Sequence, residues 1–164
     1  MFTSQDGVPD PTSGFSFSLS QEVDGLSVKL RIEAGSSIRG GRMPANRARV
    51  TMEERVPGSL DIAIVDPIVE AVVDVWEPLA GNVRDRAVLS LARPTNSWQV
   101  PIGHRIWLHQ SVASIDEAAA GVTVTHRETG TILATPDDWT AQQVVDGMRE
   151  TLSMNNVDSV PHET

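Results

Sequence analysis

A run of acidic residues without any cation occupies the middle of the chain. Between Arg55 and Arg84 the sequence holds five carboxylates and no Lys, Arg or His. Four of them fall at helical spacing and would form one stripe: Asp66, Glu70, Asp74 and Glu77. Like charges at i, i+4 destabilise a helix by about 0.2–0.5 kcal/mol per pair, and no neighbouring cation offsets that cost. The stripe therefore indicates a solvated helix face or a docking site for a basic partner.

The other side of this predicted helix is apolar. It carries Ile68, Val69, Ala71, Val72, Val75 and Trp76. This pattern is typical of an amphipathic helix whose apolar side lies on a core. We therefore expect Trp76 to be buried and the acidic stripe to form a bare outer surface.

Side chains suited to acid–base or metal chemistry do not converge in the sequence. His104 and His109 are separated by five residues, which on a strand sends them to opposite faces. His126 and His162 stand alone, so a histidine site is not favoured. The adjacent pair Asp137-Asp138 is better explained by the dipole of a following helix.

Catalytic and nucleotide-binding motifs are missing as well. The chain lacks G-x-S-x-G, a Walker loop, G-x-G-x-x-G and H-E-x-x-H, and it has neither Cys nor Tyr. Gly40-Gly41 between Arg39 and Arg42 could cradle a phosphate, but no helix follows, and a flexible loop is the simpler interpretation. We expect no catalytic residue, no cofactor and no metal.

Composition narrows the class of partner. The chain has 164 residues, 40% of them apolar, and a formal charge of −9. That charge argues against nucleic acid and anionic membranes, although seven basic residues lie between Lys29 and Arg55. No window resembles a membrane helix or a signal peptide, so we expect a cytoplasmic protein with a protein partner.

The chain as a whole predicts one α+β domain. Residues 15–154 would form it, between flexible tails at 1–14 and 155–164. Its largely antiparallel sheet, an N-terminal hairpin plus further strands, would pack with two main helices. Strand alternation on both sides of Asp24-Gly25 indicates the hairpin, and alternation from Ala48 to Met52 indicates a third strand.

The second half alternates strands and helices. Asp66-Pro67 predicts the start of the acidic helix, and Val88, Leu89 and Leu91 favour a short strand. Val100 to His109 should form another strand, with Trp107 covering the sheet face opposite Ile106. A second hairpin turns at Thr129-Gly130, and Thr135-Pro136 predicts the start of a final helix packed by Trp139.

Several short segments together resemble a known family. They are Ile68 to Pro78 (IVEAVVDVWEP) with Gly81, Pro101 to Gly103 leading into Trp107-Leu108, Gly121 to Val124 with Gly130-Thr131, and Ala134 to Asp137. The succession, which covers roughly Ile64 to Leu152, resembles small α+β immunity proteins that bacteria, notably actinobacteria, encode beside polymorphic toxins. The resemblance implies a non-enzymatic inhibitor that binds a cognate toxin domain in the cytoplasm and blocks its active site.

Charge pattern and resemblance together suggest one contact surface. It comprises the stripe and the loop after it: Asp66, Glu70, Asp74, Glu77, Leu79, Ala80, Gly81 and Asn82. Two other classes stay open. One is a small enzyme with a His/Arg/Asp site on the sheet, which would need His104 or His109 to meet an Arg and a carboxylate in one pocket. The other is an assembly protein of a phage or secretion system.

Overall fold

The computed structural model describes residues 14–34, 46–96 and 98–161, and the chain has an α+β fold. By contacts it divides into two compact units, Met1–Asp61 with Glu163–Thr164, and Ile62–His162. The α+β prediction is confirmed, with three α-helices in the described residues where two were expected and with strands in two antiparallel sheets. The expected N-terminal tail up to residue 13, the Arg39–Arg42 loop and His162 lie outside the described residues.

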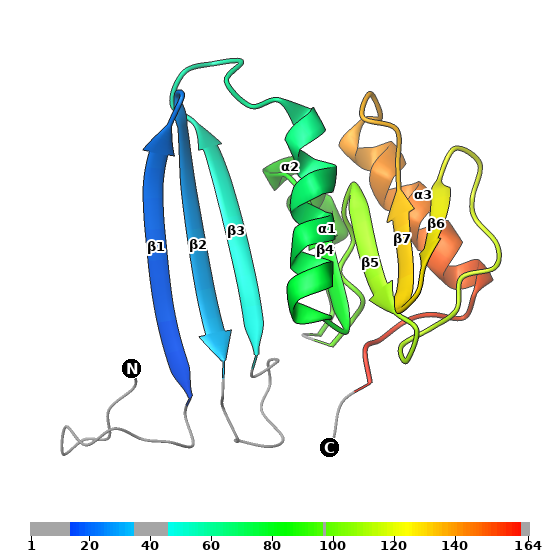
Figure 1. Ribbon diagram of the computed structural model, residues 1–164. Helices are drawn as coiled ribbons and strands as arrows, with labels where there is room; N and C mark the ends of the chain where they lie inside the picture. The colour runs from blue at the N-terminus through cyan, green and yellow to red at the C-terminus, as the bar shows by residue number, and fades with distance from the viewer. Residues whose placement is uncertain (1–13, 35–45, 97, 162–164) are drawn as a thin grey trace. The chain divides into compact units, whose positions relative to one another are not determined.

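The first unit is a three-stranded antiparallel sheet (Figure 1). Its strands are β1 (Phe15–Val23), β2 (Leu26–Ala34) and β3 (Arg47–Glu54), in the order β1-β2-β3. Asp24 and Gly25 turn the β1–β2 hairpin with φ of 48° and 81°, the left-handed conformation that a tight hairpin turn requires. The predicted hairpin and third strand are thus confirmed, and every residue of these strands is at least partly exposed.

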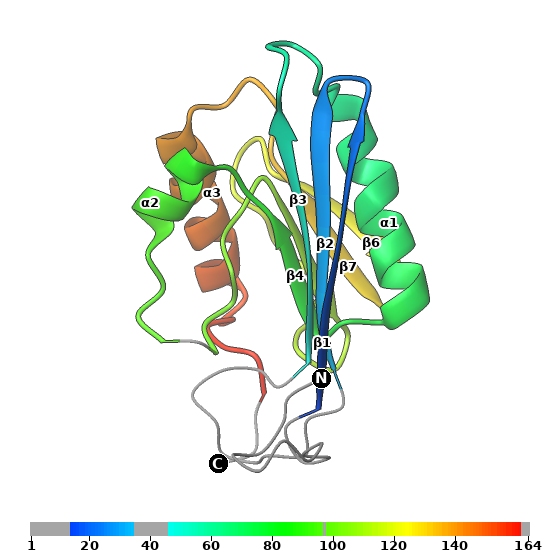
Figure 2. The ribbon, with the colours of Figure 1, turned by 90° about the vertical axis from the view of Figure 1, so that its left-hand side faces the viewer.

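The second unit is a four-stranded antiparallel sheet with helices on both faces. After the short 3-10 helix Ile62–Ile64 come α1 (Val65–Trp76), β4 (Ala80–Val83), α2 (Arg86–Ala92), β5 (Arg105–His109), β6 (Thr123–Arg127), β7 (Gly130–Ala134) and α3 (Ala141–Met154). The strand order is β4-β5-β7-β6, so β4 is an edge strand. Figure 2 shows α1 on one face of this sheet and α2 and α3 on the other.

The core of the second unit lies between the sheet and the α2–α3 pair. Ile106, Leu108 and Leu133 from the strands pack with apolar residues of both helices: Val88, Ala92, Val144, Val145, Met148 and Leu152. Trp107 is buried, as expected of a residue covering a sheet face, and its indole N–H donates to Pro78 O at 2.7 Å.

Several predicted boundaries are wrong. Helix α1 begins at Val65, so Asp66 is not its cap, and α2 occupies the segment expected as a strand at Val88–Leu91. Helix α3 begins at Ala141 instead of near Thr135. Its N-cap is Thr140, whose hydroxyl accepts from Gln143 N while the Gln143 side chain accepts from Thr140 N, a reciprocal capping box.

The segment after α3 is held to the rest of the second unit. Val100 N donates to Asp158 O at 3.0 Å, and Val160 N donates to Trp98 O at 2.8 Å. Residues 155–161, expected as part of a tail, therefore extend the hydrogen bonding of the unit. Within the described residues, no helix combines the length and apolar character needed to cross a membrane.

Candidate protein-binding surface

Two acids of the predicted stripe are neutralised by the sheet beneath α1. Asp66 Oδ1 accepts from Arg105 Nε at 2.6 Å, and Glu70 Oε1 forms an ion pair with Arg127 Nη2. Arg105 opens β5 and Arg127 ends β6, so both cations come from far along the chain. The expectation of a bare acidic stripe is wrong for Asp66 and Glu70, because α1 turns this flank toward the sheet.

Arg105 is the centre of a buried polar cluster. Its side chain is 8% exposed and also donates to Asp137 Oδ1 and to Thr135 O, each at 2.9 Å. Burial alone would lower the pKa of Arg105, but the hydrogen bonds to Asp66 and Asp137 outweigh it and raise that pKa. The cluster ties α1 to β5 and to the segment before α3, so we assign it a structural role.

The other two acids of the stripe, Asp74 and Glu77, lie at the end of α1. Among the described residues, neither Asp74 nor Glu77 has a cation partner, and both are exposed. Glu77 is the C-cap residue in left-handed conformation, φ 42° and ψ 54°, and its N–H donates to Val73 O. A residue with a Cβ is strained in this conformation, which glycine usually occupies at a helix end.

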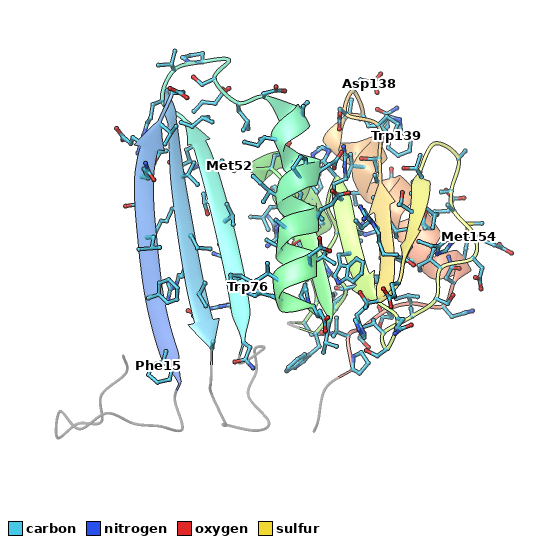
Figure 3. All side chains as sticks on the ribbon, viewed as in Figure 1. Phe15, Met52, Trp76, Asp138, Trp139 and Met154 are labelled. Carbon is cyan, nitrogen blue, oxygen red and sulfur yellow. The ribbon has the colours of Figure 1, made fainter. Side chains whose placement is uncertain are left out.

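Apolar side chains accompany these acids at the surface. Val75 is 71% exposed, Trp76 42% and Leu79 47% (Figure 3 labels Trp76). The expected burial of Val75 and Trp76 is therefore wrong, and Ala71 is exposed too. Val65 and Val73 are the buried residues of α1. The helix thus turns a different flank to its sheet than the apolar stripe predicts.

The remaining predicted contact residues belong to the sheet. Ala80, Gly81 and Asn82 lie in the edge strand β4, half-buried, where a loop was expected. Asn82 Nδ2 donates to Ile102 O at 2.7 Å, so this side-chain amide already forms a hydrogen bond within the protein. The predicted set therefore divides into paired acids, strand residues and one exposed cluster. We call that cluster the α1 C-terminal surface: Asp74, Val75, Trp76, Glu77 and Leu79.

Histidines and carboxylates form no shared reactive pocket among the described residues. His104 Nε2 lies 3.5 Å from Asp85 Oδ2, whereas His109 Nδ1 lies 2.7 Å from Ser111 Oγ. An open hollow of about 380 Å³ beside α2 and the end of α3 is lined by Arg84, Arg149 and Asp158 but by no histidine. In the part of the chain that the structure describes, no group of three His, Asp or Glu could hold a metal ion.

Comparison with protein families, with curated proteins and with solved structures found no match to this chain. The function therefore has to be inferred from the surface itself. Sequence reasoning missed Val75 and Trp76 as surface residues because they share an apolar stripe with Ile68, Val69 and Val72, which are half-buried. It missed Arg105 and Arg127 because their ion pairs span 39 and 57 residues. The sequence did carry a signal for Val75 and Trp76: the apolar stripe is wider than the contact of one helix with one sheet requires.

Proposed function

We propose that this chain is a toxin-neutralising immunity protein, acting in the cytoplasm, that binds a basic toxin domain and blocks its active site. The observation that carries the proposal is the α1 C-terminal surface: Asp74 and Glu77, which have no cation partner in the described part of the chain, accompany exposed Val75, Trp76 and Leu79. An exposed tryptophan is a residue type enriched at the centres of protein interfaces, and carboxylates around it suit the polar rim of an interface with a basic protein. The family resemblance carried by Ile68 to Pro78 concerns the same segment.

Physical chemistry gives the two parts of this surface different tasks. Unpaired carboxylates attract an electropositive cleft from a distance and so raise the association rate. The apolar side chains then supply the contact energy once water is excluded from them. Toxin domains that act on nucleic acids or nucleotides need electropositive clefts, which an acidic inhibitor can enter and seal.

Backbone strain at Glu77 supports a functional reason for this residue. A non-glycine residue in left-handed conformation costs about 1–2 kcal/mol, and glycine would remove that cost. Glutamate therefore keeps a charge at the helix end at the expense of stability. Such local conflicts concentrate at functional positions.

The test uses the variant D74K/E77K, which reverses charge without breaking a known ion pair. Wild-type and variant proteins carrying an affinity tag are used to capture partners from the native host, and domains enriched by wild type alone are expressed and purified. We expect one of them to be a basic toxin domain that wild type inhibits. Its association rate with the variant should fall about 10- to 100-fold at low salt and converge with wild type as salt rises.

The matched control is E128K/E150K, which makes the same charge change at two exposed acids that form no ion pair within the described residues. This control should associate at close to the wild-type rate. The proposal is wrong if saturating wild-type protein leaves every captured domain fully active. The assignment of the surface is wrong if both variants slow association equally.

A further inference from the structure

The three-stranded sheet presents a cationic row on its polar face. Strand pairing places Ser18, Arg31 and Arg49 side by side, and the next row on this face is Ser20, Lys29 and Thr51. Rows two residues apart along a strand repeat every 6.6–6.8 Å, roughly, because the rise is about 3.3–3.4 Å per residue. We call these six residues the cationic face. Each of them carries a hydrogen-bond donor, and none carries a negative charge.

Carboxylates flank the cationic face at both ends: Glu33 beyond Arg31, and Glu22 with Glu53 in the row beyond Lys29. Among the described residues, however, only one of the three cations of this face, Arg31, forms an ion pair with a carboxylate. Glu33 accepts from Arg31 Nη2 at 2.7 Å and from Arg47 Nε, and the hydrogen bond from Arg47 lowers the pKa of Glu33. Among the described residues, neither Lys29 nor Arg49 pairs with a carboxylate. Two of the three cations of the cationic face thus form no ion pair with a described carboxylate.

The pairing of Arg31 with Arg49 works against the fold. The two guanidinium groups stand directly opposite each other on neighbouring strands, a like-charge arrangement that destabilises a sheet. Stability alone would favour threonine or an opposite charge at one of these positions. A local conflict of this kind is expected where a surface is kept for binding.

The charge of the whole chain does not describe this face. Residues 1–61 hold seven Lys and Arg against eight Asp and Glu, whereas residues 62–162 hold six against 13. The acidity of the chain therefore belongs mainly to the second unit. Screening limits the field of exposed charges to about 10 Å at 0.1 M salt, so the charges of this sheet, its cations and the glutamates in the adjacent rows, decide what approaches it.

We propose that the cationic face binds the phosphodiester backbone of nucleic acid without reading its bases. Phosphate contacts in such complexes come from Arg, Lys, Ser and Thr side chains, the types of all six residues of the cationic face, and the flanking Glu22, Glu33 and Glu53 limit the contact to these two rows. Phe15 and Phe17 alternate with the β1 serines and so lie on the opposite face of the sheet, and the described strands β2 and β3 contain no aromatic residue. No aromatic side chain of β1, β2 or β3 therefore lies on the cationic face to stack on a base. The proposal rests on the first unit alone and is independent of the α1 C-terminal surface.

The test is a fluorescence-anisotropy titration of a labelled DNA duplex of about 20 base pairs with the full chain. The three cations of the cationic face allow at most three phosphates to be neutralised, which predicts a Kd of about 50 µM at about 25 mM salt and binding about 20-fold weaker at about 75 mM. The variant K29T/R49T removes the two unpaired cations and keeps strand propensity. It should weaken binding by more than about 100-fold at the lower salt concentration.

The matched control R86T/R93T removes two exposed cations of the second unit and should bind the duplex like wild type. Poly-glutamate serves as a competitor that offers carboxylates at similar charge density. Far-UV circular dichroism of each variant checks that the sheets are kept. The proposal is overturned if K29T/R49T binds like wild type, if the control loses binding equally, if wild type does not bind the duplex, or if poly-glutamate displaces the duplex at lower charge concentration than unlabelled DNA does.

Discussion

The buried Arg105 cluster should behave as one unit under mutation. Asp66 and Asp137 both accept hydrogen bonds from this guanidinium, which is 8% exposed. Removing one acid leaves the charge paired with the other. Removing both leaves a buried cation without a counter-charge. We therefore expect D66A/D137A to destabilise the second unit by more than the sum of the two single variants.

The expected destabilisation of each variant depends on how exposed the side chains of the Arg105 cluster are. A charge-assisted hydrogen bond contributes about 1.5–3 kcal/mol, and the half-exposed acid side chains place each single variant near the lower end, at about 1–1.5 kcal/mol. An orphaned buried charge costs about 3–5 kcal/mol. The coupling free energy between Asp66 and Asp137 should therefore be about 1–2 kcal/mol, destabilising.

Urea unfolding followed by tryptophan fluorescence measures this coupling. All four tryptophans lie within residues 62–162, so the signal reports the second unit. R105M provides the control background, because it removes the buried charge and leaves mainly Thr135 O without its donor. On that background, adding D66A/D137A should change the free energy of unfolding by less than about 0.5 kcal/mol. Additive single effects in the Arg105 protein would refute the reasoning.

Three further predictions concern single positions. Glu77→Gly should raise the free energy of unfolding by about 0.5–1 kcal/mol in the same urea assay, because glycine relaxes the left-handed backbone. The hydrogen bond from Arg47 lowers the folded-state pKa of Glu33, so its stabilisation is present above the unfolded pKa of about 4.3 and is lost as pH falls through the folded value. Hydrogen exchange of β2 and β3 amides between about pH 6 and 3 should show this acid loss in wild type and much less of it in E33Q. Gly130→Ala should destabilise the second unit by about 2–3 kcal/mol or more, because the added Cβ would overlap a β5 carbonyl. At Gly81 an added Cβ would meet no atom closer than 3.8 Å, so Gly81→Ala should leave the stability nearly unchanged. Thermal melting measures both variants.

Elements specified by short-range chemistry could be predicted from the sequence. Asp24-Gly25 supplies the positive φ values that a tight hairpin requires, and alternating apolar residues on both sides set the pairing of β1 with β2. The prediction of a second hairpin at Thr129-Gly130 is confirmed by the pairing of β6 with β7, although the turn is Glu128-Thr129 and Gly130 already pairs with Arg127 as the first residue of β7. In these segments the residues that determine the structure lie next to one another in the chain.

Short or competing signals misled the prediction elsewhere. Helix α2 has seven residues, too few to show a helical period, and its apolar positions fit a strand equally well. Thr135-Pro136 has the chemistry of a helix start, yet the helix is capped by Thr140 and Gln143, whose T-x-x-Q spacing was available in the sequence. Asp137, expected to favour a helix dipole, accepts from Arg105 instead.

For the acidic stripe, the sequence pattern predicts which residues share a helix but not which of their carboxylates stay unpaired at the surface. Helical spacing correctly placed Asp66, Glu70 and Asp74 on one helix, but whether each carboxylate stays free depends on cations 39 and 57 residues away. The sheet beneath α1 supplies Arg105 and Arg127 to the first two acids only. A charge reversal at Glu70 would therefore break an ion pair, and a loss of binding could not be separated from a loss of protein stability. Asp74 and Glu77 lack such partners among the described residues, so reversing them isolates the electrostatic attraction on which the proposed toxin-binding role depends.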